Sequence, residues 1–283
     1  MRLRLPELNQ KQLIMKDYKL AAVQMNSQPD LDHNLEKAHG FIKEAAAHGA
    51  SLISLPENFA FLGHLESRLE ESERIAVQTE KFLAEAARQY GVYLLGGSYP
   101  VLAASGKVYN RSTLIGPDGS TLAAYDKIHL FDVDLEGGES YRESDYVQPG
   151  ENGPVVYESD DLGAIGLSVC YDLRFPELYR VLSKNGAEML TVPSAFTKTT
   201  GKVHWHPLLK ARAIENTCYV LAPAQTGIHG KNRKTYGHSL IIDPWGNILA
   251  DAGEETGVVY AEFKPKLIAE VRRSIPSLKH RRL

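Results

Sequence analysis

A thiol, a carboxylate and an amine each stand at the end of an apolar segment of this 283-residue chain. Cys170 follows the apolar run 163–169, and Glu57 and Lys127 follow two earlier runs. A carboxylate can remove the proton of a thiol, and an ammonium group can stabilise both a thiolate and the oxyanion that the thiolate creates. These three residue types therefore predict acyl transfer without a metal or an organic cofactor.

The sequence around Cys170 favours a reactive thiol. Residues 176–185 have the pattern of a helix, and the amides and dipole at a helix N-terminus favour a thiolate. A buried cysteine more commonly packs as a small hydrophobic side chain, as expected for Cys218, whose apolar strand continues on both sides. Because Glu57 alone fits a loop carboxylate and Lys127 alone a solvated strand end, the prediction depends on all three residues together.

Strand and helix patterns alternate along the chain, and the second half repeats the order of the first. The predicted elements of the first half are strands 18–25, 52–56, 92–98, 109–115 and 120–125 with helices 31–48 and 72–90. Those of the second half are strands 163–169, 189–192 and 218–223 with helices 176–185 and 207–216, followed by a hairpin. We therefore predict an α/β fold, a four-layer α-β-β-α sandwich with two mixed sheets that is internally pseudo-duplicated.

Three segments with these residues resemble the motifs of the nitrilase superfamily of carbon-nitrogen hydrolases. They are Leu-Pro-Glu-Asn at 55–58, Tyr-Asp-Lys-Ile-His-Leu-Phe at 125–131 and Val-Cys-Tyr-Asp-Leu-Arg-Phe-Pro-Glu at 169–177. The resemblance extends from Lys19 to about Phe263. It implies an N-terminal extension over 1–17, a hydrolase domain over 18–264 and a C-terminal tail over 265–283.

The resemblance also implies a role for each residue. Glu57 is a general base and then a general acid, Lys127 stabilises the tetrahedral intermediate, and Cys170 forms the thioester. The backbone N–H of Tyr171 is expected to bind the oxyanion.

A second active-site glutamate is also implied by the resemblance. Glu143, in the sequence Tyr-Arg-Glu-Ser, matches it, while Glu136 and Glu139 are near enough in the chain to be alternatives.

Stretches 194–216 and 222–246 resemble superfamily members that hydrolyse ω-amides of α-keto acids. Deaminated glutathione is the first expected substrate and α-ketoglutaramate the second; another amide, a nitrile or a non-catalytic scaffold role are the alternatives. The small-molecule substrate would carry carboxylate groups, which require cationic or hydroxyl donors. The candidate substrate-binding residues are Tyr171, Arg174, Phe196, Thr199 and Thr200, the two threonines in a predicted loop.

Two of these candidates have structural alternatives. Arg174 could instead form an ion pair with Glu177 or Asp172, and Phe196 could be a core residue rather than pocket wall.

Composition and net charge indicate which kinds of partner and which location to expect for this protein. A net charge of −3 and a pI near 6.4 argue against a nucleic-acid surface, and no run reaches the ~20 apolar residues that cross a membrane. Residues 1–17 lack the apolar core of a signal peptide, so two reduced cysteines and a cytoplasmic location are expected. The family resemblance implies a homodimer or a higher homo-oligomer.

One histidine pair raises the question of a metal. His204 and His206 flank Trp205, but no further ligand lies near them in the sequence. A catalytic zinc site needs at least three protein ligands, so we predict no metal and no other cofactor.

Overall fold

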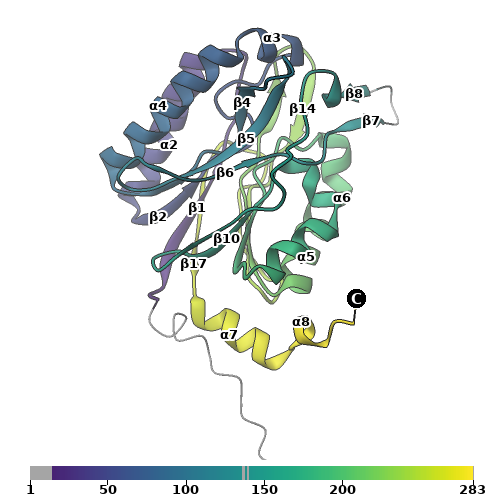
Figure 1. Ribbon diagram of the computed structural model, residues 1–283. Helices are drawn as coiled ribbons and strands as arrows, with labels where there is room; N and C mark the ends of the chain where they lie inside the picture. Colours follow the sequence, from purple (N-terminus) through teal and green to yellow (C-terminus); the bar gives the residue numbers. More distant parts are fainter. Residues whose placement is uncertain (1–14, 136–137, 139, 283) are drawn as a thin grey trace, which may run out of the picture.

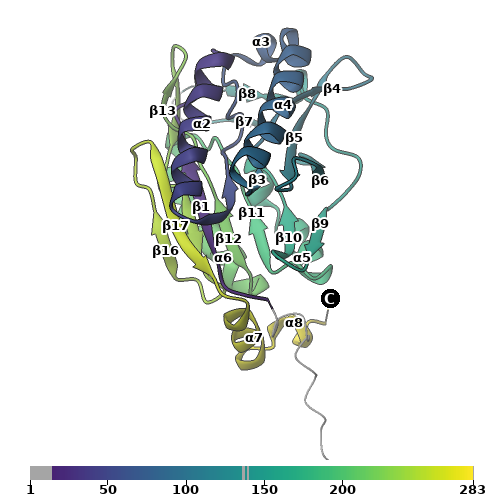
Figure 2. The same ribbon diagram turned by 90° about the vertical axis from the view of Figure 1, so that its left-hand side faces the viewer.

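The computed structural model describes residues 15–135, 138 and 140–282, so most of the predicted extension 1–17 lies outside the described residues. Two mixed sheets pack face to face with helices on both outer sides (Figures 1 and 2). The predicted four-layer α-β-β-α sandwich is thus confirmed.

Each sheet is built around three neighbouring parallel strands. The first has the order β17 (Gly257–Phe263), β1 (Tyr18–Gln24), β2 (Ala50–Ser54), β3 (Tyr93–Leu95), β5 (Val108–Ile115) and β4 (Tyr99–Leu102), with β6 (Thr121–Asp126) also paired to β5. The second has the order β16 (Ile248–Asp251), β15 (Leu240–Ile242), β12 (Tyr219–Ala222), β11 (Met189–Thr191), β10 (Gly163–Leu167) and β9 (Val156–Ser159).

The strand directions confirm the internal duplication. In the first half β1, β2 and β3 are parallel and β5 is antiparallel to β3. In the second half β10, β11 and β12 are parallel and β15 is antiparallel to β12. Because parallel strands need crossover connections, a helix follows each of the first two strands in both halves.

The helices α2 (Leu31–Ala47) and α4 (Ser72–Tyr90) cover the first sheet, and α5 (Pro176–Lys184) and α6 (Lys198–Asn216) cover the second (Figure 1). Side chains of β1 alternate between two cores. Leu20 and Ala22 pack in the core that includes the second sheet, and Ala21 and Val23 pack in the core that includes α2 and α4. This period of two explains why buried strands here are apolar on both faces.

One predicted helix begins in the wrong place. The sequence predicted a helix from Pro207, but α6 begins at Lys198 and Pro207 lies inside it. The Thr197 side chain accepts a hydrogen bond from the Thr200 N–H and so caps the earlier start. Thr199 and Thr200 are therefore in the first turn of a helix, not in a loop.

The remaining elements lie around these layers. They are α3 (Leu65–Glu70), the hairpin of β7 (Asp132–Asp134) and β8 (Ser140–Arg142), the hairpin of β13 (Thr226–His229) and β14 (Arg233–Tyr236), the short helices η1 (Glu143–Asp145) and η2 (Cys170–Arg174), α7 (Pro265–Ser274) and α8 (Ser277–His280). In α7, Ile268 and Val271 are buried, and Arg272 donates a 2.7 Å hydrogen bond to the carbonyl oxygen of Ala187. Among the described helices, none combines the length and the apolar content needed to span a bilayer.

Gly97 fixes the chain beside Glu57 and provides a test. Its φ is +48°, and a Cβ placed there would lie 2.0 Å from the carbonyl oxygen of Pro56. Gly97→Ala is expected to lower the free energy of unfolding by about 3 kcal/mol or more, through overpacking and left-handed strain together. Gly91→Ala is the control, because Gly91 has φ +63° but no atom within 4 Å of the point where a Cβ would lie. It should lose only about 1 kcal/mol. Equal losses in chemical denaturation would contradict this explanation.

Candidate active site

The turn between β10 and α5 presents Cys170. This residue has φ +47°, a left-handed conformation that costs a residue other than glycine about 1–2 kcal/mol. A 3.0 Å hydrogen bond from its N–H to the carbonyl oxygen of Pro193 holds the turn. Strain of this kind is common where a reactive side chain must point away from the backbone path.

A buried carboxylate joins the cysteine turn to the lysine segment. Asp172 accepts a 2.8 Å hydrogen bond from the N–H of Val169, next to the cysteine. Its carboxylate also accepts 2.8 Å and 3.1 Å hydrogen bonds from the Tyr125 hydroxyl and the His129 N–H. Asp172 is fully buried, so these bonds replace its hydration and fix the two segments relative to each other.

The structure brings Cys170, Glu57, Lys127 and Glu143 into one buried group. The Lys127 Nζ lies 2.7 Å from Oε2 of Glu143 and 3.3 Å from Oε1 of Glu57. The other Glu57 oxygen accepts a 2.8 Å hydrogen bond from the Ala195 N–H, and the carboxylate is also hydrogen-bonded to the Cys170 thiol. Glu136 and Glu139, the alternatives to Glu143, lie outside the described residues.

Burial and charge set the protonation of this group. Burial raises the pKa of the Cys170 thiol, the Glu57 charge raises it further, and the Lys127 charge opposes both. Burial would also raise the pKa of Glu57, but attraction to Lys127 and hydrogen bonds from Cys170 and Ala195 bring it below its usual value. The pKa of Lys127 is raised, because two carboxylates outweigh its burial. The resting site therefore holds a thiol, a carboxylate that can accept its proton, and an ammonium group.

Asn110 is a member of the site that sequence analysis missed. Its Nδ2 lies 2.9 Å from Oε1 of Glu57 and 3.4 Å from Oε1 of Glu143. It lies on β5, and its carbonyl oxygen accepts a hydrogen bond from the Lys127 N–H. Asparagine is disfavoured in strand interiors, so an asparagine in the run 108–115 was a signal that could have found it.

A pocket opens at Cys170. Of the predicted substrate-binding residues, Tyr171, Phe196 and Thr200 line it, together with Glu57, Lys127 and Glu143. The lining also includes side chains that sequence analysis did not single out, notably Arg68, Phe131, Tyr141 and Arg233. Phe131 is the last residue of the lysine motif, whereas Arg68, Tyr141 and Arg233 lie outside the three motifs.

Two predicted substrate-binding residues lie beside this lining. The Arg174 guanidinium is 5.2 Å from the centre of the Phe196 ring and 5.7 Å from that of Tyr171, and its Nη1 is 3.2 Å from Nδ1 of His204. Thr199 is exposed in the first turn of α6.

The Carbon-nitrogen hydrolase family model matches residues 19–273, which is most of the chain. The chain belongs to the carbon-nitrogen hydrolase family. The match confirms the superfamily resemblance inferred from the three motifs, and it makes the protein a member of an enzyme family that hydrolyses carbon-nitrogen bonds.

Three relatives illustrate the similarity of this hydrolase. It is 55% identical to the deaminated glutathione amidase of Synechocystis sp. over 269 residues, covering 94% of this chain and 99% of the relative. It is 37% identical to the human omega-amidase NIT2, covering 95% and 96% of the two chains. The crystal structure of Saccharomyces cerevisiae Nit3, a member of branch 10 of the nitrilase superfamily, matches with a TM-score of 0.85 and 33% identity over 95% of this chain and 97% of that one.

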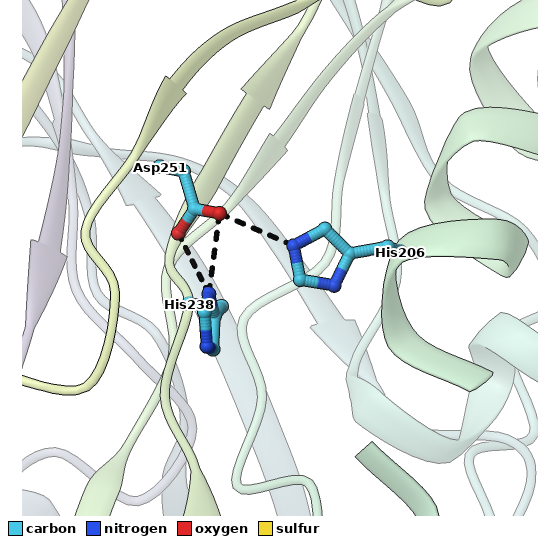
Figure 3. A group of neighbouring side chains, drawn as sticks. All are labelled: His206, His238 and Asp251. Carbon is cyan, nitrogen blue, oxygen red and sulfur yellow. Dashed lines mark hydrogen bonds and ion pairs between the residues drawn. The ribbon is translucent and has the colours of Figure 1, made fainter. Parts of the chain in front are cut away.

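His206, His238 and Asp251 form a second cluster (Figure 3), and none of the three is among the residues that line the pocket. Nε2 of His206 is 3.2 Å from Oδ2 of Asp251, and Nδ1 of His238 is 2.9 Å from Oδ1 of the same carboxylate. The donor atoms of the three residues lie within 4.8 Å of one another, and two imidazoles with a carboxylate are ligand types that suit zinc. The expectation that no third ligand lies near His206 is therefore wrong, although the absence of a bound metal stays a prediction.

The charge of Glu57 should control the ionisation of Cys170. Because that charge raises the pKa of the thiol while Lys127 lowers it, Glu57→Gln is expected to lower the Cys170 pKa. The midpoint of Cys170 alkylation by iodoacetamide against pH, followed by peptide mass spectrometry, should move down by about 1 to 2 pH units. Amide hydrolysis should fall by about 10²- to 10⁴-fold, because the general base is lost. The buried Cys218 is the internal reference. An unchanged or higher midpoint would refute this assignment.

Proposed function

We propose that this carbon-nitrogen hydrolase cleaves the ω-amide bond of deaminated glutathione through a thioester on Cys170. The supporting observation is the buried contact among the Cys170 thiol, the Glu57 carboxylate and the Lys127 ammonium in the lining of one pocket. The 55% identity to a deaminated glutathione amidase, over nearly the full length of both chains, supports the choice of substrate.

Acylation begins with proton transfer from the Cys170 thiol to Glu57. The sulfur then attacks the amide carbonyl carbon, and a C–S bond forms as the carbonyl oxygen becomes an oxyanion. Lys127 uses two of its three N–H groups on Glu57 and Glu143, and the third has no acceptor in the described part of the chain. That N–H and the backbone N–H of Tyr171 stabilise the oxyanion.

Collapse of the tetrahedral adduct breaks the C–N bond. Protonated Glu57 gives its proton to the departing nitrogen, so ammonia or an amine leaves and the thioester remains. Glu57 then removes a proton from water, and the hydroxide attacks the thioester. The carbon-sulfur bond breaks to give the carboxylic acid and the Cys170 thiolate, which takes the proton from Glu57 and restores the thiol and the carboxylate. Glu143 and Asn110 act as positioning residues for Lys127 and Glu57.

Omega-amidase activity on α-ketoglutaramate is the second candidate. The 37% identity to human omega-amidase NIT2 favours it, though less strongly than the 55% identity favours deaminated glutathione. Both compounds are ω-amides of the same α-keto acid, so they share the acyl half and differ in the leaving group. Activity on a nitrile and a purely non-catalytic scaffold role are further outcomes of the test below.

Side chains of the lining provide the substrate contacts in this proposal. Tyr171 and Phe196 supply an aromatic wall, and Thr200 supplies a hydroxyl donor. Arg174 packs against both aromatic rings and so positions them from outside the lining. Arg174 and Thr199 are not part of the lining, so a substrate could contact them only if it extended beyond the pocket.

We also propose that the protein is a cytoplasmic homodimer or higher homo-oligomer that binds no nucleic acid. The two free cysteines are consistent with a reducing compartment. The net charge of −3 is consistent with the absence of a nucleic-acid partner. Val203 and Ile214 on α6 and Val181 on α5 are exposed, at 66%, 51% and 39%. Burial of this apolar helical face against a second copy would remove it from water.

The catalytic proposal predicts that replacing Cys170 impairs activity but not stability, whereas replacing Cys218 impairs stability but not activity. Cys170→Ala should lower kcat by about 10³-fold or more while the thermal unfolding temperature stays near the wild-type value. Cys218→Ala, the matched control, should keep its activity and lose about 1 kcal/mol of stability. Wild-type kcat/KM should be highest for deaminated glutathione, then α-ketoglutaramate, then a nitrile. A higher value for the nitrile, or equal activity of both variants, would sink the proposal.

The oligomer proposal predicts that one charge in the apolar helical face changes the assembly. Val203→Glu should reduce the molar mass measured by light scattering toward the 31.4 kDa of one chain, because a buried charge without a partner is unfavourable. Val77→Glu, at an equally exposed site on α4, is the control. A wild-type monomer would rule the oligomer out.

A further inference from the structure

Two arginines of the pocket lining have buried guanidinium nitrogen atoms without a hydrogen-bond partner in the described part of the chain. Arg68, on α3, is 2% exposed, and both its Nε and its Nη2 are unpartnered. Arg233, on β14, has a buried and unpartnered Nε. Each guanidinium carries five N–H donors, and a buried charged donor without an acceptor is unfavourable.

Both arginines belong to the pocket of Cys170. They line it together, and α3 and β14 lie at the same end of the molecule (Figure 1). Nη2 of Arg233 is 3.5 Å from the carbonyl oxygen of Ala195, the residue whose N–H binds Glu57. Arg68 interacts electrostatically with Glu143, Arg233 and Glu57, so the two cations border the catalytic group.

The charges of the pocket do not balance. Lys127 already makes ion pairs with both Glu57 and Glu143. Arg68 and Arg233 are therefore added cations, and three positive groups face two carboxylates in the lining. An anionic group of the substrate would remove the excess positive charge.

We propose that Arg68 and Arg233 form a carboxylate-binding subsite that holds the substrate end remote from the scissile amide. The guanidinium groups bind this carboxylate while the amide carbonyl carbon lies at Cys170. The pocket therefore selects substrates that carry a carboxylate at one end and an amide at the other, which are monoamides of dicarboxylic acids. This inference rests on the proposed amidase function and names the residues that recognise its substrate class. It assigns to these two arginines the recognition that the sequence had suggested for Arg174.

Kinetics with a matched pair of substrates test the subsite. Arg68→Met and Arg233→Met should each raise KM for α-ketoglutaramate by about 10- to 100-fold, and leave KM for its uncharged methyl ester unchanged. Arg68→Lys keeps the positive charge but loses the planar guanidinium that can form two hydrogen bonds to one carboxylate, so it should give an intermediate KM. Arg74→Met, a surface arginine on α4, is the control. An unchanged KM for the acid, or an equal rise for the ester, would overturn the proposal.

Binding without turnover separates this inference from the proposed function. In a Cys170→Ala background, α-ketoglutarate should bind in calorimetry, and Arg68→Met or Arg233→Met should abolish that binding without lowering the unfolding temperature. A purely structural arginine would instead lower that temperature. Arginine-dependent binding with no hydrolysis of deaminated glutathione would support the subsite and refute the substrate. Normal hydrolysis with binding that depends on Arg174 alone would refute the subsite.

Discussion

A buried ammonium group between two buried carboxylates is the interaction on which the active site depends. Lys127 contacts Glu57 and Glu143, and all three side chains are almost completely removed from water. Any one of these charges would be strongly unfavourable in this place without the others, because a buried ion needs a partner and hydrogen bonds. The same ammonium keeps Glu57 ionised beside the Cys170 thiol, so the arrangement that stabilises the charges also prepares the proton transfer.

The sandwich supplies the rigidity that this arrangement requires. Asn110 and Lys127 are held by neighbouring segments of the first sheet, whereas Cys170 belongs to the second. Asp172 connects the two through the lysine segment, and Ala195 reaches across to Glu57. Hydrogen bonds of this kind fix side chains to within the tolerance that catalysis needs. The packing of the two sheets against each other therefore sets the positions of the side chains in the active site.

In the function we propose, the reacting group and the carboxylate-binding arginines come from different parts of the fold. The reacting group lies at the ends of strands and in the turns that follow them, where the duplicated core determines position. Arg68 and Arg233 come instead from α3 and a peripheral hairpin. Such peripheral elements can change without disturbing the core, which is how related folds acquire different substrates.

The sequence by itself determined the layered fold, the duplicated order of strands and helices, and the group of Glu57, Lys127 and Cys170. Periodicity and residues at strand ends are local signals, and parallel strands bring their ends to one edge. Only the tertiary structure decided the contacts of Asn110 and Asp172, the early start of α6, and the grouping of His206 with His238 and Asp251. It alone also placed Arg68 and Arg233 in one pocket. Each of these depends on contacts between segments far apart in the chain, which no local pattern encodes.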